Sequence, residues 1–524
     1  MKKKDKRKGR RQRLDNEFEL EQLVEQVSYA MNGVGSSNLN VQKEGLQDLI
    51  RQFDNQTLRG QIALVNTQLG NACAKSALHA VKTNPALAAI VLAKLYMEDD
   101  LSELQGGNKL LVSEDCLEQL LQAAFSNGKE TIDATDMLGC LDLEAIGFDP
   151  CWLTRLSDSD ACLLALQIVV KLDCLRLKLL FVDGENVHCA EEKTKVIKML
   201  VRVLVEKLKT DDLPPPKSLE MWRLCQLAGI AEDYSSVIQL CKYFLPVEDG
   251  NDLLGYLLKV SRQAISQRKD DVVAQAFALS CMRVLANLTH ENPVSWDTIN
   301  VVSVYDFFKS VADSSAGVAF DVKVVLLVTL INSVEDHGAN REHLVGEPCK
   351  HFVDFFVSTI PKETIDALIK NEKQIDFNWT AEQLVPCSYM CILFGCLMRD
   401  NAHNQAFFKS HIPGGSLAII IQVLQAFLTF QENAGVLEEN AMKKTIAIME
   451  EIARLSGSPI KVHNKKPTKA TSSSEPSTSF PVPTTRKRPA QPKPKPIPQP
   501  KTPPTKKPKS PSRRKSVHNL DDVL

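Results

Sequence analysis

Apolar side chains recur every three or four residues along most of this 524-residue chain. Leu20, Leu23, Val24 and Val27 show this spacing near the start, and the pattern returns up to about Leu455. Such spacing puts apolar side chains on one face of an α-helix, whereas a strand would alternate them at every second residue. Alternating runs are hard to find, and no two of them are joined by an Asn-Gly or Asp-Gly turn. The sequence therefore predicts an all-α fold.

Short polar breaks separate the predicted helices. The Asn84-Pro85 dipeptide predicts a helix start, the Ser/Asp segment 157–160 predicts a cap, and the prolines at 214–216 separate two helices. Segments such as 162–172 and 322–331 are apolar on nearly every face, which is typical of helices buried between neighbours. Buried and half-buried helices over about 440 residues predict a HEAT/armadillo-like helical solenoid with divergent repeats.

Charge divides the chain into three segments. Residues 1–13 have a net charge of +8 and residues 461–524 have +13, whereas residues 14–460 hold 38 basic and 60 acidic side chains, a net charge of −22. Residues 457–524 contain 15 of the 26 prolines and one aromatic residue, a composition that cannot bury enough surface to fold. We predict a basic disordered N-terminal arm over 1–16, a helical repeat domain over 17–456 and a disordered Pro/Lys/Ser-rich basic tail over 457–524.

The acidic body and the cysteines restrict the possible functions. An acidic body is repelled by phosphate backbones, so it is a poor nucleic-acid binder and is better suited to protein partners. The 14 cysteines include no Cys-x-x-Cys pair, and most lie among Leu, Val and Ala, which indicates buried thiols in a reducing compartment. No signal peptide is visible, and the stretches 322–331 and 417–430 are too short or too interrupted to span a membrane.

No motif predicts catalysis. The Gly-Val-Gly segment 33–35 lacks the third glycine and the preceding strand of a dinucleotide-binding loop, so it predicts a helix-ending turn. Cys387, Cys391 and Cys396 fall on one apolar helix without a histidine, which favours a buried position over a metal site or a nucleophile. We expect no enzyme activity, no cofactor, no bound metal and no small-molecule substrate.

The basic tails contain short motifs that resemble nuclear-import signals. Non-specific contact with DNA through counterion release is a second interpretation that can coexist with import, and a solubilising tail without a specific partner is a third. The residues of these motifs are Lys2, Lys3, Lys4, Arg486, Lys487, Arg488, Lys506 and Lys507.

Three serines near the C-terminus match kinase sites. Ser458 and Ser510 precede proline, as in proline-directed sites, and Ser516 follows Arg-Arg-Lys, as in basophilic sites. Phosphates there would remove positive charge from the tail and weaken its electrostatic contacts. We hypothesise that phosphorylation tunes the tail during the cell cycle; unchanged chromatin residence after Ser→Ala substitution at all three positions would refute this.

Three ordered blocks in the second half carry a family resemblance. The first is CMRVLANLTHEN at 281–292; the second joins FDVK at 320–323, INSVE at 331–335, NR at 340–341 and LV at 344–345; the third runs from LFGCL at 393–397 through IPGG at 412–415 to LQAFL at 424–428. These blocks resemble the C-terminal domain of the Wapl (wings apart-like) cohesin-release family. The N-terminal half matches this family more loosely.

The resemblance implies a non-enzymatic, nuclear and chromatin-associated regulator of cohesin. Members of the family bind the cohesin complex through its kleisin, its peripheral HEAT subunit and its SMC subunits, together with the Pds regulatory HEAT protein. They promote release of cohesin from chromatin, in mitosis or meiosis, and cohesin itself supplies the ATP hydrolysis. Larger members use Phe-Gly-Phe motifs, which this chain lacks. Its partner contacts are then expected from the folded body, or the chain is a short form with altered affinity.

Several residues in these blocks are candidates for specific roles. Asn287 and Asn332 end apolar helices, where we favour hydrogen bonds to unpaired carbonyls and the next loop over direct partner contact. Glu335, Asn340 and Arg341 follow on a predicted loop and are candidate partner-binding residues. Two alternatives remain open: a generic nuclear helical-repeat scaffold or adaptor, and a chromatin-binding protein that acts through its tails.

Overall fold

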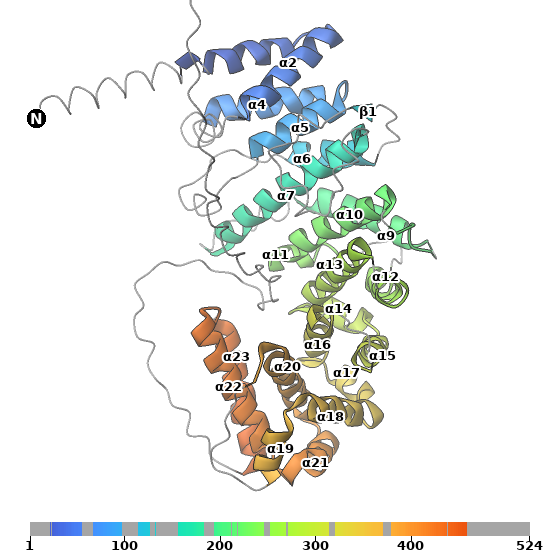
Figure 1. Cartoon of the computed structure of the whole chain (residues 1–524), viewed down its shortest axis with the longest axis vertical. Coiled ribbons are helices and arrows are strands. Elements are labelled where there is room, and N and C mark those ends of the chain that lie inside the picture. Colours follow the sequence, from blue (N-terminus) through green and yellow to red (C-terminus); the bar gives the residue numbers. More distant parts are fainter. Residues whose placement is uncertain are drawn as a thin grey trace, which may run out of the picture. The chain divides into compact units, whose positions relative to one another are not determined.

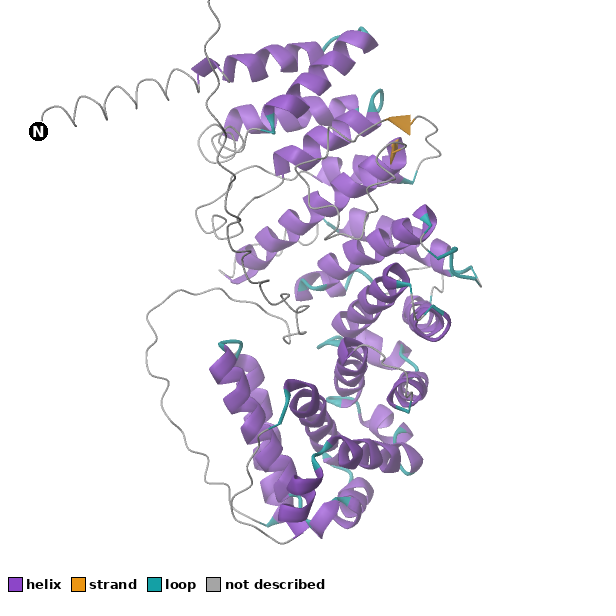
Figure 2. Cartoon of the chain, in the orientation of Figure 1, coloured by secondary structure: helices purple, strands orange, loops and turns teal. Residues whose placement is uncertain are grey.

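The computed structural model describes part of the chain, and the described part is almost entirely helical (Figure 2). This confirms the predicted all-α fold. The described residues all belong to the unit Met1–Val482, and the second unit, Pro483–Leu524, lies outside them. The arm 1–16 and the tail beyond Gly457 also lie outside, so the predicted domain division stays a prediction. The described ranges are 21–22, 24–54, 67–96, 114–125, 131–132, 156–182, 193–210, 212–216, 218–245, 252–268, 271–313, 320–369, 379–437 and 439–457.

Helices follow one another from residue 24 to residue 456 (Figure 1). Residues 24–34 are helical and are followed by α2 Leu39–Gln52, α4 Thr67–Ala80, α5 Pro85–Tyr96, α6 Glu114–Ala124, α7 Asp158–Val182, α9 Thr194–Leu208, α10 Leu219–Ser235 and α11 Ile238–Cys241. The second half contains α12 Leu253–Gln267, α13 Val272–Thr289, α14 Pro293–Thr298, α15 Val301–Ala312, α16 Phe320–Val334, α17 Gly338–His343, α18 Glu347–Thr359, α19 Lys362–Ile369, α20 Ala381–Met398, α21 Ala402–His411, η4 Pro413–Gly415, α22 Ala418–Ala434 and α23 Glu439–Ser456. A two-residue antiparallel pair joins β1 Thr131–Ile132 to β2 Leu156–Ser157, with Thr131 opposite Ser157.

Most of the long helices form two layers. In layer A each helix packs on the next, in the order α2, α5, α7, α10, α13, α16, α20 and α23. Layer B runs beside it through α6, α9, α12, α15 and α18, and these helices pack on α7, α10, α13, α16 and α20 respectively. One layer B helix and the following layer A helix therefore form a repeat, as expected for a helical solenoid. The short helices α11, α14, α17 and α21 each directly follow a helix of layer A.

Helix boundaries follow the chemistry predicted from the sequence. Helix α5 begins at Pro85, α7 begins within the Ser/Asp segment 157–160, and the three prolines lie between α9 and α10. The side chain of Asp252 accepts a hydrogen bond from the Gly255 amide at the start of α12. The side chain of Asn300 does the same for Ser303 at the start of α15. Such caps satisfy backbone N–H groups that no helical carbonyl can reach.

The apolar segments 162–172 and 322–331 lie within α7 and α16 and are largely buried, as predicted. The segment 33–35 ends a helix, as predicted, and it also allows a close approach: a Cβ on Gly45 would lie within 3.0 Å of the backbone of Ala30, Gly33 and Val34. Glycine at position 45 therefore lets α2 pack directly against residues 24–34.

Two described helices are long and apolar enough to cross a membrane by length and composition. They are α13 and α20, not the segments that the sequence had suggested as the most apolar. Of their apolar windows, 56% and 83% respectively are buried inside the fold. Packing against neighbouring helices on both sides accounts for this apolar character, because a helix buried all round needs no polar face.

Candidate functional site: charged residues at the ends of layer A helices

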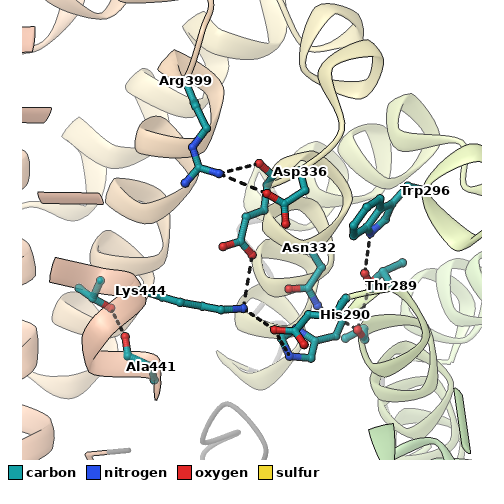
Figure 3. Close-up of polar contacts among 12 residues, drawn as sticks. Thr289, His290, Trp296, Asn332, Asp336, Arg399, Ala441 and Lys444 are labelled. Carbon is teal, nitrogen blue, oxygen red and sulfur yellow. Dashed lines mark hydrogen bonds and ion pairs between the residues drawn. The ribbon is translucent and has the colours of Figure 1, made fainter. Parts of the chain in front are cut away.

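Three layer A helices end beside one another in the second half of the chain. Helices α13, α16 and α20 end at Thr289, Val334 and Met398, and a short helix begins a few residues after each. We call the few residues between each long helix and the next short helix a link, and each link contains at least one acidic residue. These are Glu291 after α13, Glu335 and Asp336 after α16, and Asp400 after α20. We call the charged residues gathered here, Glu291, Glu335, Asp336, Arg399 and Lys444, the helix-end cluster (Figure 3).

Lys444 of α23 joins two of these links. Its Nζ lies 2.8 Å from Glu291 Oε1 and 4.0 Å from Glu335 Oε2 (Figure 3). The ammonium group therefore bridges the links that follow α13 and α16. The hydrogen bond with Lys444 lowers the pKa of the Glu291 carboxyl below its usual value. Burial alone would lower the pKa of Lys444, but its hydrogen bond with Glu291 and the nearby carboxylates raise it overall.

Two arginines bind the end of α16. Arg399 Nη1, which follows α20, donates to the Glu335 carbonyl at 3.0 Å and lies 3.4 Å from Asp336 Oδ1. Arg341 Nη1, from α17, donates to the carbonyls of Val334 at 3.3 Å and Glu335 at 3.0 Å. The last carbonyls of a helix lack amide partners and carry partial negative charge, so guanidinium groups stabilise this end.

His290 lies beside the cluster, with its Nε2 3.9 Å from Glu291 Oε1 (Figure 3). Burial lowers the pKa of His290, and the nearby Lys444 ammonium lowers it further, while Glu291 opposes the shift. The imidazole is therefore mainly neutral at neutral pH, and the positive charge of the cluster comes from Lys444 and Arg399.

Of the two asparagines predicted to bind unpaired carbonyls and the next loop, Asn332 binds such a carbonyl at the end of another helix, whereas Asn287 binds a serine hydroxyl. Asn332 Nδ2 donates to the Ala286 carbonyl of α13 at 2.9 Å, and Asn287 Nδ2 donates to Ser235 Oγ of α10 at 3.1 Å. Ala286 lies in the last turn of α13, where carbonyls lack helical partners. Each asparagine therefore ties its helix to the preceding helix of layer A, and not to the loop that follows.

Charged pairs tie other layer A helices together in the same order. Arg223 of α10 binds Asp160 of α7 through two hydrogen bonds of 2.6 and 3.0 Å. Arg283 of α13 lies 3.1 Å from Glu232 of α10. The donor lies on the later helix in both pairs, as it does for the asparagines. These bonds hold successive repeats in a fixed alignment, since each joins two neighbouring layer A helices through residues at least 46 positions apart in the sequence.

The three candidate partner-binding residues lie near one another but differ in exposure. Asn340 and Arg341 belong to α17, not to a loop. Asn340 is 5% exposed, and its amide group donates to the carbonyls of Trp296 at 3.0 Å and Ser333 at 2.9 Å. These bonds position the links around α17. The Glu335 side chain is 17% exposed and faces Lys444. A partner-binding role for Glu335, Asn340 and Arg341 stays a prediction.

Sequence reasoning missed Lys444, Arg399 and Glu291. Lys444 and Glu291 are 153 positions apart, and no local spacing relates them. One signal was available in the sequences THEN at 289–292, VEDH at 334–337 and MRDN at 398–401, which follow three apolar helices. In each, the third residue is acidic and the fourth caps the next short helix. Aligning these links would have placed Glu291, Asp336 and Asp400 at equivalent positions.

A cleft of about 580 Å³ opens between α12 and the start of α15. Lys259, Arg262 and Ser266 line one side, and Thr298, Asn300 and Ser303 line the other. The cleft carries mixed polar groups but no described catalytic pair, so it can accommodate a polar segment of a partner without implying a reaction.

The described cysteines are free thiols, and most of them are buried, as the sequence predicts. Each of the described cysteines is free, and all are buried except Cys225, which is half-buried. Cys387, Cys391 and Cys396 lie inside α20, as predicted. Burial raises the pKa of Cys225 to about 12. Among the residues described, no group of three or more His, Cys, Asp or Glu could hold a metal ion.

The tail motifs fall outside the described residues. This applies to the import candidates Lys2, Lys3, Lys4, Arg486, Lys487, Arg488, Lys506 and Lys507, and to the phosphorylation candidates Ser458, Ser510 and Ser516. Their roles stay predictions.

Comparisons with known proteins add little. No protein-family model matches the chain, and no characterised protein matches its sequence. Among solved structures, an engineered protein from a structural genomics consortium is similar at 14% identity, with a TM-score of 0.31, over 83% of this chain and 100% of the engineered one. A similarity this low carries no argument, and the fold assignment rests on the helices described above.

Proposed function

We propose that this chain is a non-enzymatic regulator of cohesin, whose helical body binds cohesin subunits and promotes their release from chromatin. One observation carries the proposal. The sequence blocks that resemble the Wapl family, which span 281–428, include the ends of α13 and α16, and their segment 393–397 lies in the last turn of α20. Most residues of these blocks are buried in the core, and two exposed or half-buried ones, Glu291 and Glu335, belong to the helix-end cluster, so the resemblance reaches this polar surface.

The charge of this surface supports a protein partner with basic side chains. The carboxylates of Glu291 and Asp336 are more than half exposed, while Lys444 and Arg399 neutralise them only in part. The surrounding body is acidic, with a net charge of −22 over residues 14–460. Such a surface repels nucleic acid and attracts a basic protein segment. In cohesin, such a segment could lie on the kleisin or on the peripheral HEAT subunit.

Binding to purified cohesin subunits tests the proposal. The full-length chain is compared with the Asp336→Lys variant by calorimetry, against the kleisin and the peripheral HEAT subunit at physiological salt. Asp354→Lys is the matched control, because Asp354 is an exposed acid of α18 in layer B. We expect Asp336→Lys to weaken binding about five- to tenfold and Asp354→Lys to leave it unchanged, since charge reversal in an interface costs about 1 kcal/mol or more. Absence of binding by the unaltered chain refutes the proposal.

A tail-driven chromatin protein is the second candidate, favoured by the net charge of +13 over residues 461–524. It predicts binding to DNA with a steep dependence on salt concentration, because each neutralised phosphate releases counterions. A variant with its tail lysines and arginines replaced by glutamine separates the two candidates. If the variant loses DNA binding but still binds cohesin, cohesin is bound by the helical body, as in the first candidate. If it loses both, binding depends on the tail, as in the second.

A further inference from the structure

Helix α23 contacts more of layer A than its position in the chain requires. It packs on α20, its neighbour in the layer, and on α22. Its Lys444 also reaches Glu291, which follows α13, a helix two places earlier than α20 in the layer. Helices α13, α16, α20 and α23 therefore form a ring of contacts that Lys444 closes (Figure 3). A plain stack of repeats needs no such closure, because each repeat contacts only its neighbours.

The two halves of α23 are held by different forces. Ile448, Met449 and Ile452 are buried in the second half. Gly395 of α20 allows this contact, because a Cβ there would lie within 3.0 Å of Ile448 Cγ2. In the first half Glu439 and Lys443 are exposed, and the ion pairs of Lys444 fasten the helix to the links after α13 and α16.

We propose that α23 is a strap, which Lys444 latches across the ends of α13 and α16 and which opens when the latch is broken. Glycines mark both ends of the strap. Gly435, between α22 and α23, has a φ of +69°, and Gly457, directly after α23, also has a φ of +69°. Glycine adopts this left-handed conformation without strain and ends the helix before it, so α22 and α23 are separate helices that are not fused into one rigid rod.

The latch is weak enough to open. Side-chain exposure is 53% for Glu291 and 36% for Lys444, so water and salt screen the pair. Exposed pairs of this kind shift an equilibrium by about two- to fivefold, and the apolar second half of α23 keeps the helix attached. When the strap opens, Glu291 and Glu335 lose their shared cation, and both carboxylates and the neighbouring His290 become more accessible. The strap thereby controls access to the helix-end cluster, whatever partner binds there.

Hydrogen–deuterium exchange on the full-length chain tests the strap. We expect Lys444→Ala to speed exchange in the first half of α23 and in residues 289–292 about two- to fivefold, and Lys444→Glu to speed it further. Lys443→Ala is the control, since Lys443 pairs only with the local Glu439 among the described residues, at 2.7 Å. In a double-mutant cycle, Glu291→Gln should speed exchange in the same segments, and adding it to Lys444→Ala should have little further effect, because the ion pair is already broken.

Specific outcomes overturn the strap. Equal effects of Lys444→Ala and Lys443→Ala, or no effect of Lys444→Ala, would show that Lys444 does not latch α23. Fully additive effects of Glu291→Gln and Lys444→Ala would show that the effect does not come from the pair. Peptides from α5, which lies three places before α13 in layer A, report general unfolding, so faster exchange there in Lys444→Ala also counts against a local strap.

Discussion

Substitution of Gly395 by alanine tests how α23 packs on α20. The added Cβ would lie within 3.0 Å of Ile448 Cγ2, and Ile452 Cδ1 lies 3.5 Å away. Carbon atoms pack best at about 3.5–4.0 Å, so Ile448 or the whole of α23 must shift by at least about 0.5 Å. Overpacking of this kind costs about 1–3 kcal/mol. Alanine recovers up to about 1 kcal/mol through its higher helix propensity. The net destabilisation should therefore lie between about zero and 3 kcal/mol.

Gly229 provides a matched control. It lies within α10, and a Cβ there would meet only Gln167 Nε2, at an ordinary contact distance of 3.8 Å. Gly229→Ala should gain up to about 1 kcal/mol from helix propensity without overpacking. The two variants should thus differ by about 1–3 kcal/mol in the free energy of unfolding, in favour of Gly229→Ala.

Urea unfolding of the full-length chain, followed by far-ultraviolet circular dichroism, measures this difference. Adding Ile448→Leu to Gly395→Ala should restore part of the loss, because leucine has no branch at Cβ and removes the methyl group that clashes. The reasoning is refuted if Gly395→Ala is as stable as Gly229→Ala, or if Ile448→Leu fails to improve it. Either result would mean that α23 does not approach α20 at Gly395.

Three further predictions concern buried charges and thiols. Burial raises the pKa of Asp233 to about 7, above its value in the unfolded chain, so the folded chain loses stability as the pH rises from about 4 to 7 and this carboxyl ionises. In Asp233→Asn the free energy of unfolding should fall about 1–2 kcal/mol less between pH 5 and pH 8, as measured by urea unfolding at the two pH values. Arg223→Ala leaves the buried Asp160 carboxylate without its main partner and should cost about 2–3 kcal/mol, less than for a fully buried pair because Arg223 is partly exposed; a loss below about 0.5 kcal/mol would contradict this. Cys225, with a pKa of about 12, should resist alkylation at pH 8 in the native chain and react after unfolding, as read by peptide mass spectrometry.

Much of the fold follows from local sequence chemistry. The spacing of apolar residues predicted the helices, and prolines and capping residues predicted several of their ends, as at Pro85 and between α9 and α10. These features depend on residues within a few positions of one another, so the sequence alone contains them. The burial of α20 was also readable, because apolar residues surround this helix.

The candidate site was only partly predictable. Helical periodicity shows which face of a helix is buried but not which helix covers it, so the contact of Lys444 with Glu291 had no local signal. For the same reason the expected bond of Asn332 to an unpaired carbonyl could be predicted, but not that this carbonyl belongs to the preceding helix of layer A. Asn340 was read as a surface residue because it follows a helix end, but the short helix α17 turns its side chain inward to two backbone carbonyls.

Cohesin release on DNA circles tests the central claim most directly. Cohesin is loaded onto circular DNA, washed in high salt, and incubated with the Pds regulatory protein, ATP and the full-length chain, with and without Asp336→Lys. Retained cohesin is then quantified. The account predicts that the unaltered chain lowers the retained fraction and that Asp336→Lys reduces this effect. Equal retention with and without the unaltered chain, in a reaction where cohesin is active, would contradict the release function.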